Sequence, residues 1–456
     1  MRLSRRRFLG GAAAAAVGAA SIYELVDEYS GGTPVRHSSL DLPREQHVLD
    51  LSTTQSEGVE VIVPPLHSQV FTATLQDVDL EKAQRQLEEA LQELEATYDP
   101  TTPAGLAVTV GWGLPYFARL GHAVDAHLPY DRRAQKPVLL PTRRFPSDPE
   151  STILERNDVA FLLRSDSRGN LAEAQRTLQG LDFLHVTTLR SGFAGGGFDG
   201  QQSLPKKLAM AAGVPGADLI PETAELFLGF TSTQKAGLGP RKIANHETLG
   251  YVDLRSGYFH GGTHMHLSHI SEDLEAWYLN FNYDERVLTA FSPGQQAKTN
   301  QQTIPQGPED IQNASEVTQG FHKTGRFGHS GSIQTASRLL QDHVGPDGTV
   351  YLKGTAIPQR ADFNTLDNPF TFTDDAVRDN WSHEPAAGVH FVVFNPTGDD
   401  FERGRLAMDG VLPDGTQLDT EPRSRAQGFN SVLTTTHRQN FLVPPRAHRS
   451  FPLAEL

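Results

Sequence analysis

Runs of apolar residues with strand and helix periods predict two similar α+β units along the chain. In the first half, short runs typical of strands alternate with two longer stretches in which apolar residues recur every three or four positions. The predicted strands cover 69–75, 106–110, 158–164 and 184–189. One predicted helix follows Asp79, and the other begins with Asn170 and Glu173 as a capping box. The order β-α-β, β-α-β predicts a ferredoxin-like unit, an antiparallel sheet with helices on one side.

The second half shows the same alternation of strand-like and helix-like runs, with less regular spacing. Strands are predicted at 226–230 and 389–394, and a helix at 400–408. Ser271 is predicted to cap another helix, with Glu272 and Asp273 in its first turn. The simplest architecture is therefore α+β, with two ferredoxin-like units side by side and a ligand site in the second.

Length and composition agree with a folded protein of several parts. The chain has 456 residues, of which 38% are hydrophobic and 21% charged, enough for two or three domains with a substantial core. We predict a leader and linker at 1–44, an N-terminal ferredoxin-like domain at 45–222 and a C-terminal one at 223–456.

The net charge and the cysteine content limit the partners and the metal ligands that the chain can have. The net charge of -15, with no basic patch to offset it, argues against nucleic acid as a partner. The absence of cysteine excludes disulfides and thiolate ligands, which leaves histidine as the expected soft ligand for a metal.

The first residues match a twin-arginine export signal. Ser4-Arg5-Arg6-Arg7-Phe8-Leu9 fits S-R-R-x-F-L, and the small-residue apolar run at 10–22 is too short for a confident membrane span. We expect export by the twin-arginine translocase to the periplasm, the exterior or the membrane surface. Because that route carries folded proteins, often with a cofactor already loaded, the motif favours a cofactor protein.

The segment 325–364 carries the main candidate site. His329 opens a helix-like run in a glycine- and serine-rich stretch, and Arg360 follows a short strand. Neutral imidazole can supply the axial nitrogen of a haem iron, and a fixed guanidinium suits the face where peroxide binds. The alternative is an ordinary surface histidine and arginine.

A group of histidines offers a second candidate. Alternation in an extended strand places His264 and His266 on one face and His269 on the other. The first pair with an acidic residue could bind a transition metal, or the histidines could be hydrogen-bonded residues of a core or pocket.

A glycine-rich stretch at 192–220 contains Gly196-x-x-Asp199-Gly200. Glycine lets the backbone approach a ligand closely, so this segment could be a cofactor loop. A flexible loop with an ordinary turn aspartate is the alternative.

Between about residues 60 and 410 the sequence resembles the dye-decolourising peroxidase family, in a divergent exported branch. The matching pieces, in chain order, are LFLGFTST, SGYFHGGTHMHLSHISEDLEAWY, GRFGHSGS, QRADFN and GVHFVVFN. The resemblance implies two ferredoxin-like halves of the dimeric α+β barrel type, with haem b in the C-terminal half. It places His329 at the proximal ligand and Arg360 at the distal arginine. Gly229, Phe230, His264 and His266 are further candidate cofactor contacts.

The chain departs from the family at the distal G-x-x-D-G motif. That motif falls on Gly229-Phe230-Thr231-Ser232-Thr233, so Ser232 stands where the family has an aspartate with an acid–base role. A serine hydroxyl can position a peroxide but carries no negative charge near neutral pH. Either catalysis relies on Arg360, or another carboxylate such as Asp199 substitutes.

The resulting hypothesis is an exported haem b peroxidase that oxidises an organic reductant with hydrogen peroxide, with Arg360, Ser232 and Asp199 as catalytic candidates. Electrons would enter through surface aromatics such as Trp277, Tyr278 or Trp381. His322 is the alternative axial ligand. A non-catalytic haem or iron protein of the same fold and a histidine-rich metal-binding protein are the alternative functions, and self-association is left open.

Overall fold

The computed structural model describes residues 42–56, 59–76, 79–195, 203–222, 224–229, 254, 257–292, 296–298, 301–304, 312–344, 348 and 350–456. The export signal and most of the linker, at 1–41, lie outside the described residues. In the part that is described, no helix has both the length and the apolar character needed to cross a membrane.

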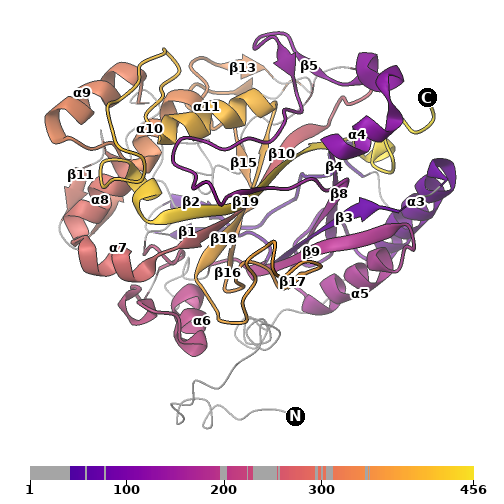
Figure 1. The fold of residues 1–456 in the computed structure, drawn as a ribbon, viewed down its shortest axis with the longest axis horizontal. Helices are drawn as coiled ribbons and strands as arrows, with labels where there is room; N and C mark the ends of the chain where they lie inside the picture. Colours follow the sequence, from indigo (N-terminus) through magenta and orange to yellow (C-terminus); the bar gives the residue numbers. More distant parts are fainter. Residues whose placement is uncertain are drawn as a thin grey trace.

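The first unit is a four-stranded antiparallel sheet with two helices on its outer face (Figure 1). Its elements in chain order are β3 His67–Leu75, α3 Leu80–Thr97, β4 Ala107–Gly113, β8 Val159–Ser165, α5 Arg168–Gln179 and β9 Leu184–Phe193. The strands lie side by side in the order β9-β3-β8-β4. Numbered along the unit this order is 4-1-3-2, the ferredoxin-like arrangement that the sequence predicts.

The second unit repeats the same order. Its four strands and final helix are β10 Thr263–Glu272, β16 Phe363–Thr365, β18 Gly388–Asn395, α11 Gly398–Met408 and β19 Leu433–Val443. The spatial order is β19-β10-β18-β16, again 4-1-3-2. Between β10 and β16 the chain forms α7 Leu274–Asn280, α8 Tyr283–Phe291, α9 Ala314–Thr324 and α10 His329–Ser337.

The two sheets join at both edges into one closed barrel. At one edge β9 pairs with β16 through Phe193 and Asn364, and at the other β4 pairs with β19 through Trp112 and Leu442. Closure leaves neither main edge unpaired. The predicted α+β fold with two ferredoxin-like units in a barrel-like arrangement is therefore confirmed, whereas the exact domain boundaries stay predictions.

The remaining elements are short. They are β1 Thr53–Ser56, β2 Val59–Ile62, α4 Leu114–Leu120, η1 His122–His127, β5 Tyr130–Asp131, β6 Lys136–Pro137, β7 Ile153–Leu154, α6 Leu204–Ala212, η2 Ala217–Leu219, β11 Gln296–Lys298, β12 Gln301–Ile304, β13 His343–Val344, β14 Val350–Tyr351, β15 Gln359–Arg360, β17 Phe372–Thr373, η4 Gly428–Ser431 and η5 Arg446–His448.

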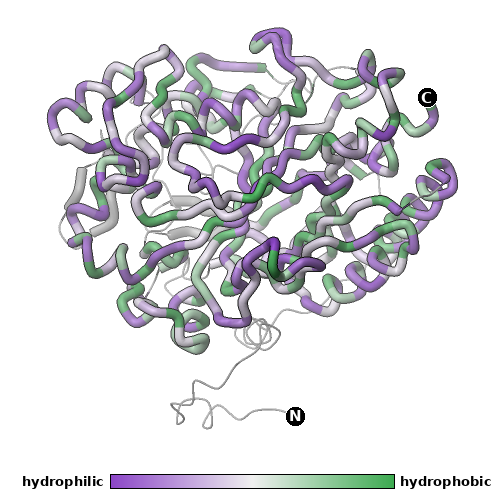
Figure 2. The backbone as a smooth tube through the Cα atoms, viewed as in Figure 1, coloured by the Kyte–Doolittle hydropathy of each residue, from purple (hydrophilic) through white to green (hydrophobic). Residues whose placement is uncertain are grey.

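The first unit is stabilised by an apolar layer between its helices and its sheet. On α3, Leu87, Leu91 and Leu94 recur at helical spacing and are buried, while the acidic and amide side chains face outward. Figure 2 shows this contrast, with hydrophilic residues along α3 and hydrophobic stretches in the strands. At each helix start a side chain accepts a backbone hydrogen bond: Asp79 from Lys82 and Ser167 from Asn170. The predicted cap at Asn170 is thus one turn too late.

Two predicted elements of the second half are wrong. The described part of 226–230 forms turns rather than a strand, and Gly229 has a left-handed φ of 83° that a strand cannot contain. Side chains of α7 hold these turns, because Trp277 donates to the carbonyl of Leu228 and Tyr278 to that of Phe227. Ser271 does not cap a helix: β10 continues through Glu272, and Asp273 is the cap of α7.

Candidate functional site

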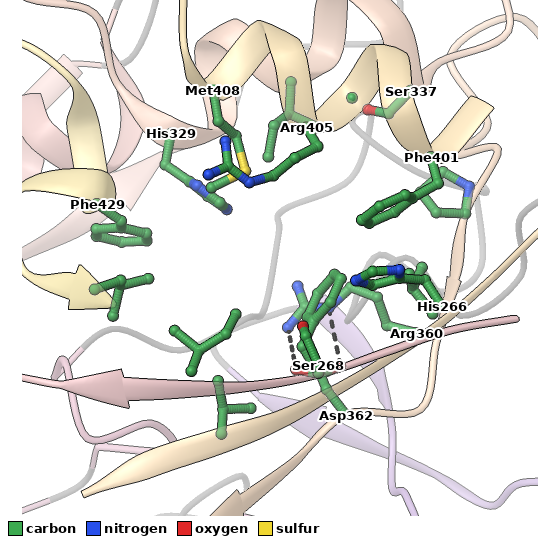
Figure 3. Close-up of a pocket in the computed structure, with 18 of the residues that line it drawn as sticks. His266, Ser268, His329, Ser337, Arg360, Asp362, Phe401, Arg405, Met408 and Phe429 are labelled. Atoms are coloured by element: carbon green, nitrogen blue, oxygen red, sulfur yellow. Dashed lines mark hydrogen bonds and ion pairs between the residues drawn. The ribbon is translucent and has the colours of Figure 1, made fainter. Parts of the chain in front are cut away.

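A cavity of about 270 Å³ lies between the sheet of the second unit and the helices α10 and α11. This volume is close to the lower end of the range of roughly 300–1,000 Å³ found for small-molecule pockets. Its walls are largely apolar, and the apolar residues come from both layers: Ile270, Ile333, Val389, Phe391, Val393, Met408, Phe429 and Leu433. Figure 3 shows the two walls facing each other across the cavity.

His329 is the first residue of α10 and projects into this cavity (Figure 3). The start of the helix is fixed by a close approach to the end of α8: a Cβ at Gly328 would come within 2.3 Å of the backbone nitrogen of Ser292. The imidazole packs against Phe429, with 4.7 Å between ring centroids, and its buried Nδ1 has no hydrogen-bond partner among the described residues.

The surroundings of His329 keep its ring neutral. Burial lowers the pKa of His329 to about 3, and the positive charges of Arg360 and Arg405 add to this effect. Neutral imidazole has a free lone pair, which is the form that binds a metal ion. The ring is therefore in the protonation state of a ligand.

Arg360 lies on the wall opposite His329 (Figure 3). It belongs to β15, which pairs with β18 at Val393, so the sheet fixes its backbone. Its Nε and Nη2 donate to the two carboxylate oxygens of Asp362 at 3.0 and 2.8 Å. This two-point contact orients the guanidinium and balances its charge inside the cavity.

A second group of cations occupies another part of the cavity lining. Arg405 of α11 and Arg438 of β19 both donate to Asp148, at 3.2 and 2.7 Å, and Arg405 also donates to Ser147. Two buried nitrogens of Arg438, Nε and Nη1, have no hydrogen-bond partner in the described part of the chain. Burial lowers the pKa of Arg438 to about 9, so the group is still a cation at neutral pH.

His266 lies beside these arginines. Its Nδ1 is 2.7 Å from the amide oxygen of Asn440, and its ring stacks on Phe401 with 3.7 Å between centroids. Burial and the nearby charge of Arg438 lower the pKa of His266 well below its ordinary value. This side chain is thus a neutral, hydrogen-bonded part of the cavity wall.

Glu272 is a cavity residue that the sequence analysis missed. Alternation along β10 puts it on the same face as His266, Ser268 and Ile270, all of which line the cavity. Its Oε2 is buried without a hydrogen-bond partner. Burial and the charge of Asp362 raise the pKa of Glu272 to about 8. The sequence predicts this residue in the first turn of a helix, whereas β10 continues through it.

The other predicted site residues fall in different places. His264 shares a sheet face with His266 but packs beside Gly398 and does not line the cavity. Gly229 also lies outside the lining, although Leu226 and Leu228 belong to it. Asp199, Phe230 and Ser232 lie outside the described residues.

Two alternatives can be judged from the part of the chain that is described. His322 lies on an exposed turn of α9, away from the cavity. His269 faces the barrel interior, as alternation predicts, with its Nδ1 2.7 Å from the hydroxyl of Thr436. No cluster of three or more histidine, aspartate or glutamate side chains suited to a metal ion occurs among the described residues.

Comparisons with known proteins give a family and a set of related folds. The model of one family, described as "Family of unknown function (DUF7405)", matches residues 65–445. No curated protein sequence matches the chain.

Several solved structures are similar over most of the chain. A dye-decolorizing peroxidase from Bacteroides thetaiotaomicron is 12% identical, with a TM-score of 0.46 over 89% of this chain and 98% of its own. A dye-decolorizing protein from V. cholerae is 12% identical, with a TM-score of 0.45 over 86% and 97%. A variant of DypB from Rhodococcus jostii RHA1 in complex with heme is 12% identical, with a TM-score of 0.46 over 86% and 96%.

Proposed function

The chain belongs to this family of unknown function, and from the geometry of its own cavity we propose that it binds haem b and acts as a peroxidase. The observation that carries the proposal is the arrangement of two residues: a neutral His329 projects into an apolar cavity, and Arg360 lies on the facing wall. A ring-shaped apolar group with a metal at its centre matches such a cavity.

The donor set fits haem in three respects. His329 offers an imidazole nitrogen for the iron. The flat porphyrin would contact the apolar residues of both walls, including Ile333 and Val389. Its two carboxylates would be matched by Arg405 and Arg438, because Arg438 has two buried nitrogens without partners.

When bound, haem would supply the redox-active iron that hydrogen peroxide oxidises. The residues of the chain would then orient the peroxide and stabilise charge. Arg360, held by Asp362, would stabilise the negative charge that develops on the departing oxygen. The cavity walls would keep bulk water from the reacting oxygens.

An organic molecule would supply the electrons from the protein surface. Tyr278 of α7 is a candidate relay, because it holds the turns that include the cavity residue Leu228. Trp277 is fully buried, so the prediction that it is a surface aromatic is wrong. Trp381 is a further candidate, and its indole nitrogen donates to the carbonyl of Phe370. Export by the twin-arginine route and self-association belong to the same proposal.

A second candidate function is haem or iron binding without peroxidase turnover. The ion pair between Arg360 and Asp362 favours it, because a guanidinium engaged at two points has fewer donors free for a peroxide. The serine at position 232, in place of an aspartate, would also favour binding without turnover.

The absorption spectrum of the purified protein, with haem added, tests haem binding. We expect a Soret band in the wild type and its loss in His329→Ala, because the variant lacks the iron ligand. His322→Ala is the matched control, since His322 is exposed on α9, and it should keep the band. A Soret band that survives in His329→Ala would refute the proposed ligand.

Oxidation of a dye by hydrogen peroxide separates the two candidate functions. A Soret band together with peroxide-dependent oxidation supports the peroxidase. A Soret band that hydrogen peroxide leaves unchanged in stopped-flow absorbance supports the non-catalytic haem protein.

A further inference from the structure

One carboxyl group in the cavity differs from the others in its partners. Among the lining residues that the structure describes, the carboxyl side chains are Asp148, Glu272, Asp362 and Asp400. Asp148 pairs with Arg438 at 2.7 Å, Asp362 with Arg360 at 2.8 Å and Asp400 with Arg133 at 2.7 Å. Among the residues that the structure describes, Glu272 has no cation within ion-pair distance, and its buried Oε2 has no hydrogen-bond partner.

The sheet brings Glu272 to the wall that carries Arg360. Glu272 is the last residue of β10, where it pairs with Leu433 of β19. Asp362, which holds Arg360, is a charged group that acts on Glu272 and raises its pKa. Tyr278 also interacts with Glu272: burial raises the pKa of Tyr278, Arg286 opposes that rise, and Glu272 adds to it. A carboxyl group without a cation among the described residues therefore lines the same cavity as Arg360, within reach of the charge of Asp362.

We propose that Glu272 is the proton-transfer residue of this cavity and exchanges a proton with hydrogen peroxide bound between His329 and Arg360. The inference rests on the proposed function. Glu272 would have the acid–base role that the resemblance gives to an aspartate at the position of Ser232. Glu272 also takes the place of Asp199 as the candidate carboxylate.

The proton balance of peroxide reduction requires such a group. Each hydrogen peroxide takes two electrons from the organic reductant and two protons, the oxygen–oxygen bond breaks, and two molecules of water are released. Glu272 in its ionised form takes the proton from one peroxide oxygen and returns it to the other, which leaves as water. Arg360 cannot do this, because a guanidinium does not release its proton in a protein.

The environment of Glu272 suits this task. Burial and the charge of Asp362 raise the pKa of Glu272 to about 8, so both protonation states are populated near neutral pH. A carboxylate in a tight ion pair would hold its charge and accept a proton poorly. Because the ionised form must act first, kcat/KM for hydrogen peroxide should rise with pH across this range.

The first test needs no haem and no activity. We expect the infrared spectrum of the haem-free wild type to contain a carboxylic acid band that disappears as the pH rises through about 8. The band should be absent in Glu272→Gln, which keeps the size of the side chain, and present in Glu275→Gln, a control on the exposed side of α7. A wild type without such a band would overturn the inference.

The second test uses the haem-loaded protein. Glu272→Gln should keep the Soret band and lose about 10²–10⁴-fold in the rate of reaction with hydrogen peroxide, together with the pH dependence of that rate. Glu272→Asp, which keeps a carboxyl group, should retain part of the rate, whereas Glu275→Gln should match the wild type. A Glu272→Gln protein with the Soret band and the full rate overturns the role of Glu272 alone, whereas a wild type that binds no haem overturns the proposed function.

Discussion

The two units of the barrel share one strand order, but their helices cover the outer faces of the two sheets differently. In the first unit, α3 and α5 pack directly on the strands through a continuous apolar layer. In the second, α10 and α11 stand over a cavity whose lining includes His329, Arg360, Glu272 and Arg438. The helices of the two units occupy different sides of the barrel (Figure 1).

The difference shows how one unit can support the other. A cavity loses packing energy and buries polar groups that lack partners, both of which reduce stability. In the first unit the helices pack directly on the strands, and the closed sheet joins this unit to the second at β9–β16 and β4–β19. We infer that the first unit supplies stability and that the second uses part of it to form a site.

The largest expected effect on stability is in the first unit. Leu87→Ala should lower the free energy of unfolding by about 2–5 kcal/mol, because it leaves a void in a packed layer. Ile333→Ala in α10 should cost less, since Ile333 already borders a cavity. Urea unfolding of the haem-free variants measures both values, and equal losses would contradict the comparison.

A smaller effect is expected on the affinity for haem. Arg438→Met removes a cation with two unpartnered nitrogens, and a hydrogen bond to a charged group contributes roughly 1.5–3 kcal/mol. We therefore expect haem binding to weaken by roughly ten- to a hundredfold in an absorbance titration. Arg403→Met is the matched control, because Arg403 pairs with Asp399 and Asp400 and does not line the cavity. An unchanged affinity in Arg438→Met would exclude this residue as a haem contact.

The smallest expected effect is on how the stability of the folded protein depends on pH, and it arises from a histidine in the barrel interior. His390 is fully buried, and neither ring nitrogen has a hydrogen-bond partner among the residues that the structure describes. Burial together with His269, Arg190 and His437 lowers its pKa well below 6.5. The unfolded chain therefore binds a proton at a higher pH than the folded one. The stability that the neutral ring contributes is present above about pH 6.5 and is lost as the pH falls below it.

Substitution of His390 should remove this acid sensitivity. Between pH 7 and pH 5.5 one such histidine accounts for about 1 kcal/mol of lost stability. In urea unfolding of the haem-free protein, His390→Leu should lose about that much less than the wild type over this interval. If the two proteins lose the same amount, the ring is protonated in the folded state.

The sequence predicted the fold well because apolar runs report directly on buried strands. The strands near 69–75, 158–164 and 389–394 follow from such runs. Closure of the barrel could not be predicted in this way, since the pairing of Phe193 with Asn364 joins residues far apart in the chain. Alternation within one strand contains no signal for its partner.

The candidate site was predicted only where one local segment carried the signal. His329 and Arg360 lie in a distinctive stretch, and the structure brings both to one cavity. Arg438 comes from a distant strand, so only the folded chain shows its position beside Asp148. Glu272 was not predicted as a cavity residue, because Ser-Glu-Asp before an apolar run is typical of a helix start. In the structure, β10 continues through Glu272 and the helix begins after Asp273.

A crystal structure of the protein loaded with haem b tests the central claim most directly. We predict the porphyrin between the sheet of the second unit and α10–α11, with a ring nitrogen of His329 bonded to iron and Arg360 on the opposite face. Iron bound to His322, or a porphyrin outside this cavity, would contradict it.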